Sequence, residues 1–261
     1  MESTFTTGTD MYARGVGRYT DALAAAMLDR LDLREGDRAL DVGCGPGAAL
    51  AALAARLGAD HVAGVEPSEP FAEMAQQRVP GADVRLGTAE ELPFEDNAFD
   101  VVVSQLVVNF MKDAPRGVAE MRRVARRTVA SCVWDYAGGM QMLRAFWDAA
   151  VEIDPDAPDE ARTMRWCSPD ELKALWREAG LRDVEVDELV VSAEYANFDD
   201  YWAPFPSGLA PTGAYYVSLP PDRQRALREV AFRRLGEPAG SFELAARAWL
   251  AQGRASGSEA M

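Results

Sequence analysis

The chain has 261 residues and a formal net charge of −15, because 42 acidic residues outnumber 27 basic ones. Apolar residues make up 48% of it, enough for the core of one large domain. Proteins that bind nucleic acid replace phosphate counterions with Lys and Arg, so the acidic balance argues against a nucleic-acid partner. The four clustered arginines, Arg122, Arg123, Arg126 and Arg127, are expected at the end of a helix, where cations favour the helix dipole.

Three widely spaced cysteines form neither a CxxC pair nor a zinc pattern, and such sparse use fits a reducing compartment. The first ten residues lack a basic-then-apolar signal, and no apolar run approaches the ~18 residues that span a bilayer. We therefore expect a cytoplasmic protein that uses no membrane, nucleic acid or metal and exists as a monomer or a homodimer.

The first 135 residues alternate between helical patterns and short apolar runs. The predicted helices cover residues 19–32, 46–57, 68–78 and 114–126. The predicted strands cover residues 38–42, 61–65, 83–86, 99–104 and 128–134, and Val101-Val102-Val103 is typical of a strand buried on both faces. This alternation predicts a doubly wound parallel sheet.

The second half of the chain is less regular. A helix is predicted over 139–153, followed by a Pro- and Asp-rich loop at 154–159. Ser168-Pro169-Asp170-Glu171 is a helix start with a capping box, and Gly180 is the expected stop. Alternating apolar residues predict strands at 184–191 and 241–252, with an aromatic-rich insertion at 193–240 between them.

A glycine-rich loop follows the first predicted strand. Gly43, Gly45 and Gly47 allow a ligand to approach the backbone closely, and the following helix offers unpaired N–H groups. The pattern also fits the looser dinucleotide fingerprint. Asp41 separates the two interpretations, because its carboxylate suits the ammonium of a bound amino acid and repels a pyrophosphate. Glu66, which ends the second strand, can accept hydrogen bonds from the ribose hydroxyls of either kind of ligand.

Four segments in order resemble the motifs of class I S-adenosylmethionine-dependent methyltransferases. Ala39-Leu40-Asp41-Val42-Gly43-Cys44-Gly45-Pro46-Gly47 resembles the first motif, and Val65-Glu66-Pro67-Ser68 resembles the acidic second loop. Gly87-Thr88-Ala89-Glu90-Glu91-Leu92-Pro93-Phe94 and Phe99-Asp100-Val101-Val102 resemble the third and fourth motifs. The similarity is continuous over about 36–135 and fits the small-molecule subfamily (type 11, ubiquinone-biosynthesis-like).

The resemblance implies an α/β, Rossmann-like, doubly wound sheet of seven strands, mostly parallel with one antiparallel strand. Residues 1–261 are then one methyltransferase domain. Residues 1–35 form a helical cap segment, 36–135 the cofactor-binding core, and 193–240 a helical and aromatic substrate lid.

The resemblance also implies which residues bind S-adenosylmethionine. They are Tyr12, Arg18, Asp41, Gly43, Cys44, Gly45, Gly47, Glu66, Pro67, Thr88, Ala89, Glu90 and Gln105. In this interpretation Asp41 holds the amino group of the cofactor and Glu66 its ribose, whereas Arg18 pairs with its carboxylate. Two positions depart from the family pattern, since Thr88 replaces a common aspartate and Asn109 a common histidine.

Methyl transfer is an in-line displacement in which the protein mainly supplies proximity and alignment. A general base is needed only when the nucleophile must lose a proton, and the single histidine, His61, is expected far from the ligand-binding strand ends. The weak base candidates are Asp135, Tyr136, Glu194 and Tyr195. The predicted acceptor contacts are Asn109, Trp202, Phe205 and Tyr215.

The predicted activity is transfer of a methyl group to the O, N or C atom of a small organic molecule. Two alternatives stay open at this point. The aromatic residues of the insertion can form a small core of their own, and the protein can be a non-catalytic sensor or assembly subunit that binds S-adenosylmethionine or S-adenosylhomocysteine.

Overall fold

A computed structural model describes residues 15–255 of the chain, and these residues form two compact units. The sheet unit contains residues 21–134, 165–189 and 248–255. The helical unit contains residues 15–20, 135–164 and 190–247. The predicted insertion at 193–240 lies entirely within the helical unit, which is larger than the insertion.

Seven strands form one sheet in the order β3-β2-β1-β4-β5-β7-β6. Their bounds are β1 (Ala39–Val42), β2 (Val62–Glu66), β3 (Asp83–Leu86), β4 (Phe99–Gln105), β5 (Ala125–Trp134), β6 (Arg182–Tyr195) and β7 (Phe242–Arg254). Strands β1 to β5 pair in parallel, whereas β7 runs antiparallel to β5. The predicted fold class is therefore confirmed.

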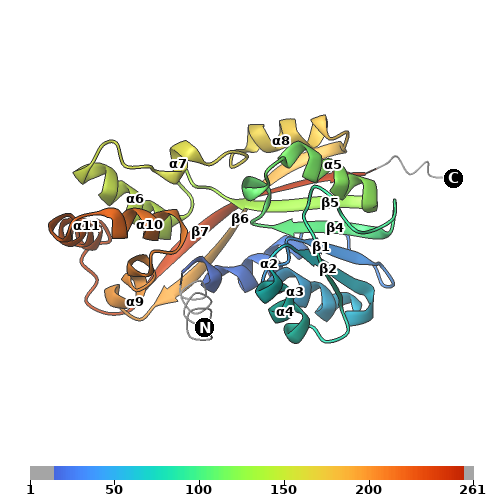
Figure 1. The fold of residues 1–261 in the computed structure, drawn as a ribbon, viewed down its shortest axis with the longest axis horizontal. Coiled ribbons are helices and arrows are strands. Elements are labelled where there is room, and N and C mark those ends of the chain that lie inside the picture. The colour runs from blue at the N-terminus through green and yellow to red at the C-terminus, as the bar shows by residue number, and fades with distance from the viewer. Residues whose placement is uncertain (1–14, 256–261) are drawn as a thin grey trace. The chain divides into compact units, whose positions relative to one another are not determined.

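Helices cover both faces of the parallel strands in the sheet unit, with α5 and α8 on one face and α3 and α4 on the other (Figure 1). The helices of this unit are α2 (Thr20–Leu28, whose first residue belongs to the helical unit), α3 (Ala48–Leu57), α4 (Glu69–Arg78), α5 (Ala114–Val124) and α8 (Pro169–Glu178), with the short turns η2 (Ala59–His61) and η3 (Val108–Phe110). The helical unit contains η1 (Val16–Tyr19), α6 (Gln141–Ile153), α7 (Glu160–Thr163), α9 (Phe198–Trp202), η4 (Phe205–Ser207), α10 (Ala210–Ser218) and α11 (Pro221–Arg234).

The core of the sheet unit lies between the parallel strands and helices α5 and α8. Leu40, Val102 and Val129 occupy one row across three strands, because Leu40 pairs with Val102 and Val102 with Val129. Met121 of α5 and Trp176 of α8 belong to the same buried cluster. Complete burial of one such side chain stabilises the fold by about 1.5–3 kcal/mol. The buried row therefore fixes the register of the strands whose carboxyl ends are described below.

The strands predicted at 128–134 and 184–191 are longer in the structure, at Ala125–Trp134 and Arg182–Tyr195, and the predicted ends of two helices are wrong. The helix predicted to extend to 126 ends at Val124, because Ala125 adopts an extended conformation and begins β5. Arg126 and Arg127 therefore lie on a strand instead of at a helix end, and Arg127 binds the carboxylate of Asp37 at 2.6 Å. The helix predicted over 19–32 ends at Leu28.

The capping prediction at Ser168 is confirmed. Its hydroxyl accepts the backbone N–H of Glu171, and Gly180 follows the helix with φ +82°. Within residues 15–255, no helix is both long and apolar enough to cross a bilayer.

Candidate functional site

The glycine loop connects β1 to α3 at the carboxyl edge of the parallel strands. Gly43, Gly45 and Gly47 all have positive φ, at +72°, +51° and +87°. A Cβ atom on Gly43 would lie 2.5 Å from a methyl group of Val107, and one on Gly47 would lie 3.1 Å from the Cα of Ala75. A Cβ atom on Gly45 would have nothing within 4 Å. Gly43 and Gly47 thus allow close packing, whereas Gly45 faces open space.

Glu66 binds the tip of this loop from the neighbouring strand. The backbone N–H of Gly45 donates to its Oε2 at 3.0 Å, and the N–H of Ser68 donates to its Oε1 at 3.0 Å. The carbonyl of Val65 accepts the N–H groups of Gly43 and Cys44 at 2.8 and 3.0 Å. The ends of β1 and β2 are therefore held by four hydrogen bonds, and the carboxylate of Glu66 lies beside the open space at Gly45.

Asp41 lies on β1 below the loop, with only 1% of its surface exposed. Neither carboxylate oxygen has a hydrogen-bond partner within the described residues. Burial raises the pKa of this carboxyl to about 7, the nearby N–H of Leu50 in the first turn of α3 opposes the rise, and the charge of Glu66 adds to it. A buried carboxylate without a partner is costly, so Asp41 needs either a proton or a bound cation.

Cys44 fills space inside the loop and carries no charge. A Cβ atom on Gly64 of β2 would lie 2.9 Å from its Sγ, so the thiol packs directly on the strand backbone. Burial, followed by the charges of Asp41 and Glu66, raises the pKa of the thiol far above its ordinary value. Cys44 is therefore a neutral neighbour of the candidate site and not a nucleophile.

The chain is similar to known methyltransferases. The methyltransferase domain family matches residues 40–130. The demethylmenaquinone methyltransferase of Roseiflexus castenholzii is 32% identical over 165 residues, which are 56% of this chain and 68% of that protein. The chain belongs to the S-adenosylmethionine-dependent methyltransferases.

Two further proteins are similar to the chain. The 27-O-demethylrifamycin SV methyltransferase of Amycolatopsis mediterranei is 32% identical over 180 residues, covering 66% of this chain and 62% of that protein. Phosphoethanolamine N-methyltransferase 2 of Haemonchus contortus, solved with phosphomonomethylethanolamine and S-adenosylhomocysteine, has a TM-score of 0.55 at 18% identity. That match covers 89% of this chain and 52% of the structure, and it shows the fold alone. The chain spans 37% to 68% of the length of the curated relatives it matches.

The predicted adenine-side residues of this methyltransferase lie after β3, except for Pro67, which directly follows β2. Glu90 accepts the backbone N–H groups of Lys112 and Asp113 at 2.9 and 3.3 Å, so its carboxylate fixes the start of α5. Burial opposes ionisation, but these hydrogen bonds lower the pKa of Glu90. Thr88 and Pro67 are exposed and Ala89 is buried. Their contacts with adenine stay predictions.

Gln105 ends β4, half-buried, and its predicted contact with the methionine end of the cofactor also stays a prediction.

The predicted N-terminal contacts belong to a different part of the chain. Tyr12 lies outside the described residues. Arg18 lies in the helical unit, where its guanidinium binds both carboxylate oxygens of Asp200 at 3.0 and 3.2 Å and the carbonyl of Glu194 at 2.8 Å. The predicted pairing of Arg18 with the cofactor carboxylate would have to compete with Asp200.

Two of the predicted base candidates are held by other side chains. Asp135 accepts hydrogen bonds from the guanidinium of Arg247 at 2.6 and 2.9 Å. The hydroxyl of Tyr195 lies 3.0 Å from that of Tyr19, and burial raises its pKa far above the ordinary value.

The other two base candidates differ in exposure. Tyr136 is buried, whereas Glu194 is exposed to solvent.

The predicted acceptor contacts divide between the units. Asn109 lies in η3 of the sheet unit, whereas the three aromatic residues lie together in the helical unit. Trp202 and Phe205 are buried, with ring centroids 6.0 and 4.5 Å from that of Phe146. Tyr215 is half-buried and donates to Asp154 at 3.2 Å. Such packing favours the alternative that these rings form a core of their own.

The sequence analysis missed a buried carboxylate in the helical unit. Glu160 begins α7, is 4% exposed and accepts the indole N–H of Trp147 at 2.8 Å. Burial raises the pKa of Glu160. Its position directly after a Pro- and Asp-rich loop gives no periodic signal of burial.

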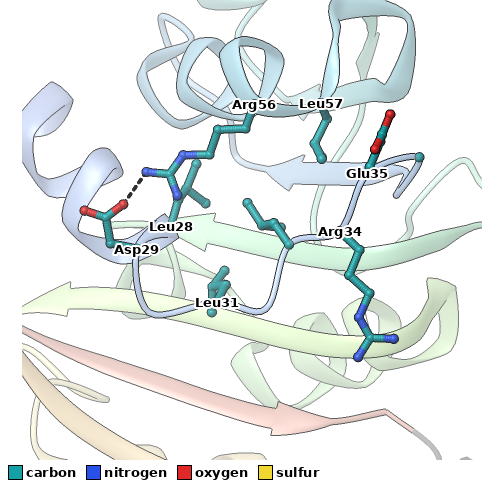
Figure 2. A pocket seen from close by; sticks show the side chains of 9 residues that line it. Leu28, Asp29, Leu31, Arg34, Glu35, Arg56 and Leu57 are labelled. Atoms are coloured by element: carbon teal, nitrogen blue, oxygen red, sulfur yellow. Dashed lines mark hydrogen bonds and ion pairs between the residues drawn. The ribbon is translucent and has the colours of Figure 1, made fainter.

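A separate pocket of about 370 Å³ opens at the amino edge of the sheet unit, next to the turn that precedes β1 (Figure 2). Four leucines form its apolar lining, Leu28, Leu31, Leu33 and Leu57. Arg56 in its wall binds Asp29 at 2.6 Å, and Arg34 binds Asp32 at 2.5 Å. The two guanidinium groups are thus neutralised locally, and the pocket lies at the strand edge opposite the glycine loop. Within the described residues, no group of three or more metal-ligating side chains could hold an ion.

Proposed function

We propose that this protein transfers the methyl group of S-adenosylmethionine to a small organic acceptor. The observation that carries the proposal is the open space at Gly45, together with two buried carboxylates, on the adjoining strands β1 and β2, that differ in their hydrogen bonding. Asp41 lacks any hydrogen-bond partner in residues 15–255, whereas Glu66 binds two backbone amides.

These residues fit the methyl donor. A carboxylate offers about four lone-pair positions, and Glu66 uses two of them for Gly45 and Ser68, so two are left for ribose hydroxyls. The ammonium group of the donor would supply the cation that Asp41 lacks, and it would contact the carboxylate directly or through a water. The missing Cβ of Gly45 leaves room for the ligand against the loop backbone.

The bound donor supplies a methyl group on a positively charged sulfur, which is already a strong electrophile. What this chain contributes is alignment of the donor with the acceptor. Asp135 and Tyr195 are held by Arg247 and Tyr19, so neither is placed as a general base. We therefore propose that the reaction proceeds mainly by proximity and alignment.

The proposed acceptor class is a small organic molecule. It follows from the relatives, which are named for demethylmenaquinone and for 27-O-demethylrifamycin SV. Among the predicted aromatic contacts, Tyr215 keeps exposed surface and remains the best candidate for touching an acceptor. Radiolabelled methyl transfer from S-adenosylmethionine into a cell extract should label the small-molecule fraction, and label confined to protein or nucleic acid would contradict this acceptor class.

Two matched glycine variants test the donor site. Gly36 and Gly45 both have positive φ, and a Cβ atom on either residue would have nothing within 4 Å. Alanine at such a backbone conformation costs about 1–2 kcal/mol, so Gly36→Ala and Gly45→Ala should lose similar stability. Only Gly45→Ala places a methyl group in the proposed donor space, and only this variant should weaken S-adenosylhomocysteine binding in calorimetric titration. Equal affinity of both variants would refute the proposed placement.

A further inference from the structure

The carboxylate of Glu66 accepts two backbone N–H groups, those of Gly45 and Ser68. We infer that Glu66 is a positioning residue, which holds the glycine loop in its binding conformation by accepting the N–H of Gly45, independently of any contact with the donor's ribose. The expected effect on ligand binding rests on the proposed function, because the ligand is the methyl donor.

The loop needs such a contact at its tip. Gly43 and Cys44 are fixed by the carbonyl of Val65, and Gly47 by the carbonyl of Cys44. Gly45 is fixed by the side chain of Glu66. Glycine loses more conformational freedom on ordering than any other residue, so a tip without this acceptor samples conformations other than the one at φ +51°.

The second oxygen of Glu66 makes the contact a bridge. It accepts the N–H of Ser68, the residue that immediately precedes α4. The carboxylate therefore joins the loop after β1 to the beginning of α4. The backbone carbonyl of Glu66 accepts the N–H of Gly87 at 3.2 Å. Hydrogen bonds to an ionised acceptor are roughly twice as strong as neutral ones, and only 7% of the residue's surface is exposed, so water competes weakly. Loss of the carboxylate should release the loop even when no ligand is present.

Amide hydrogen exchange of the ligand-free protein tests this directly. In Glu66→Ala the Gly45 amide should exchange at least about tenfold faster than in the unmodified chain, the scale of one lost charge-assisted hydrogen bond. Glu66→Gln keeps one acceptor oxygen and should fall between the two. Glu120→Ala is the matched control, because Glu120 also accepts a backbone N–H, that of Leu92 at 3.0 Å, but lies on α5. Unchanged Gly45 exchange in Glu66→Ala would overturn the inference.

Two ligands separate positioning from ribose binding. S-adenosylhomocysteine offers both ribose hydroxyls, and its 2′,3′-dideoxy analogue offers none. A positioning role predicts that Glu66→Ala weakens both ligands by about tenfold or more, with partial rescue in Glu66→Gln and no change in Glu120→Ala. Weakening of S-adenosylhomocysteine alone would make Glu66 a ribose ligand only and overturn the inference. If the unmodified chain binds neither ligand, the proposed function fails, while the exchange experiment still decides the role of Glu66.

Discussion

The ionisation of Asp41 predicts that donor affinity depends on pH near neutrality. The groups that act on this carboxyl are Glu66 on β2 and the N–H of Leu50 on α3, and it lies near the uncharged thiols of Cys44 and Cys132. None of these groups of the described chain is a cation. In the free protein Asp41 therefore stays protonated until the pH approaches its pKa of about 7. A bound ammonium favours the ionised form. Binding therefore releases a proton, and affinity rises with pH until Asp41 is ionised in the free protein.

The size of the effect follows from that pKa. If the ligand binds only the ionised form, the apparent dissociation constant is multiplied by one plus the ratio of protonated to ionised Asp41. With a pKa of about 7, this factor is roughly 11 at pH 6 and roughly 1.3 at pH 7.5, so affinity should increase about eightfold between them. Asp41→Asn removes the ionisable group and should abolish the increase. It should also weaken binding at pH 7.5 by about 1–3 kcal/mol, the usual contribution of a hydrogen bond to a charged group.

Calorimetric titration of S-adenosylhomocysteine in buffers of different ionisation enthalpy measures both the affinity and the released protons. His61→Gln is the control, because His61 is the single histidine of the chain and, in η2, precedes β2. The pH dependence should persist in His61→Gln and disappear in Asp41→Asn. The reasoning is refuted if Asp41→Asn keeps the eightfold increase, or if binding to the unmodified chain releases no proton.

Three further predictions concern stability. Burial raises the folded-state pKa of Glu160, so ionisation of Glu160 destabilises the fold as the pH rises above its unfolded-state pKa. Glu160→Gln keeps an acceptor for Trp147 and should raise Tm more at pH 8 than at pH 5. An equal change in Tm at both pH values would contradict this. Trp147→Phe leaves Glu160 without its indole donor and should cost about 1–3 kcal/mol more than Trp202→Phe in denaturant unfolding, because the indole N–H of Trp202 is buried and has no partner in the described chain. Burial of Asp37 opposes its ionisation, but Arg127 and the N–H of Arg34 lower its pKa. Asp37→Asn should therefore cost about 1–2 kcal/mol at pH 7. This difference should shrink as the pH falls below the unfolded-state pKa, and a difference that does not depend on pH would argue against the ion pair as its cause.

The parts of the fold that the sequence predicts best are governed by local patterns. The strand at residues 83–86 and the helix start at Ser168 match the structure, because the Pro80-Gly81 break before that strand and a capping box are local signals. The predicted end of α5 lies two residues too far along the chain. The backbone becomes extended at Ala125 and joins the sheet there, and the packing of a strand against its neighbours is not visible in helical periodicity.

The candidate site divides in the same way. Asp41, Gly45 and Glu66 lie on or follow strands that adjoin in the sheet, so strand order alone brings them together. The partners of Arg18 are not predictable from local patterns, since Asp200 lies 182 residues away in the chain. Glu160 gives no signal either, because its hydrogen-bond partner, Trp147, belongs to a helix on the other side of a loop.

A crystal structure with S-adenosylhomocysteine tests the central claim most directly. We expect the ribose hydroxyls at Glu66, the amino group at Asp41 directly or through one water, and the ligand in the space at Gly45. A ligand bound elsewhere, or with its ribose away from Glu66, would contradict the account of the donor site.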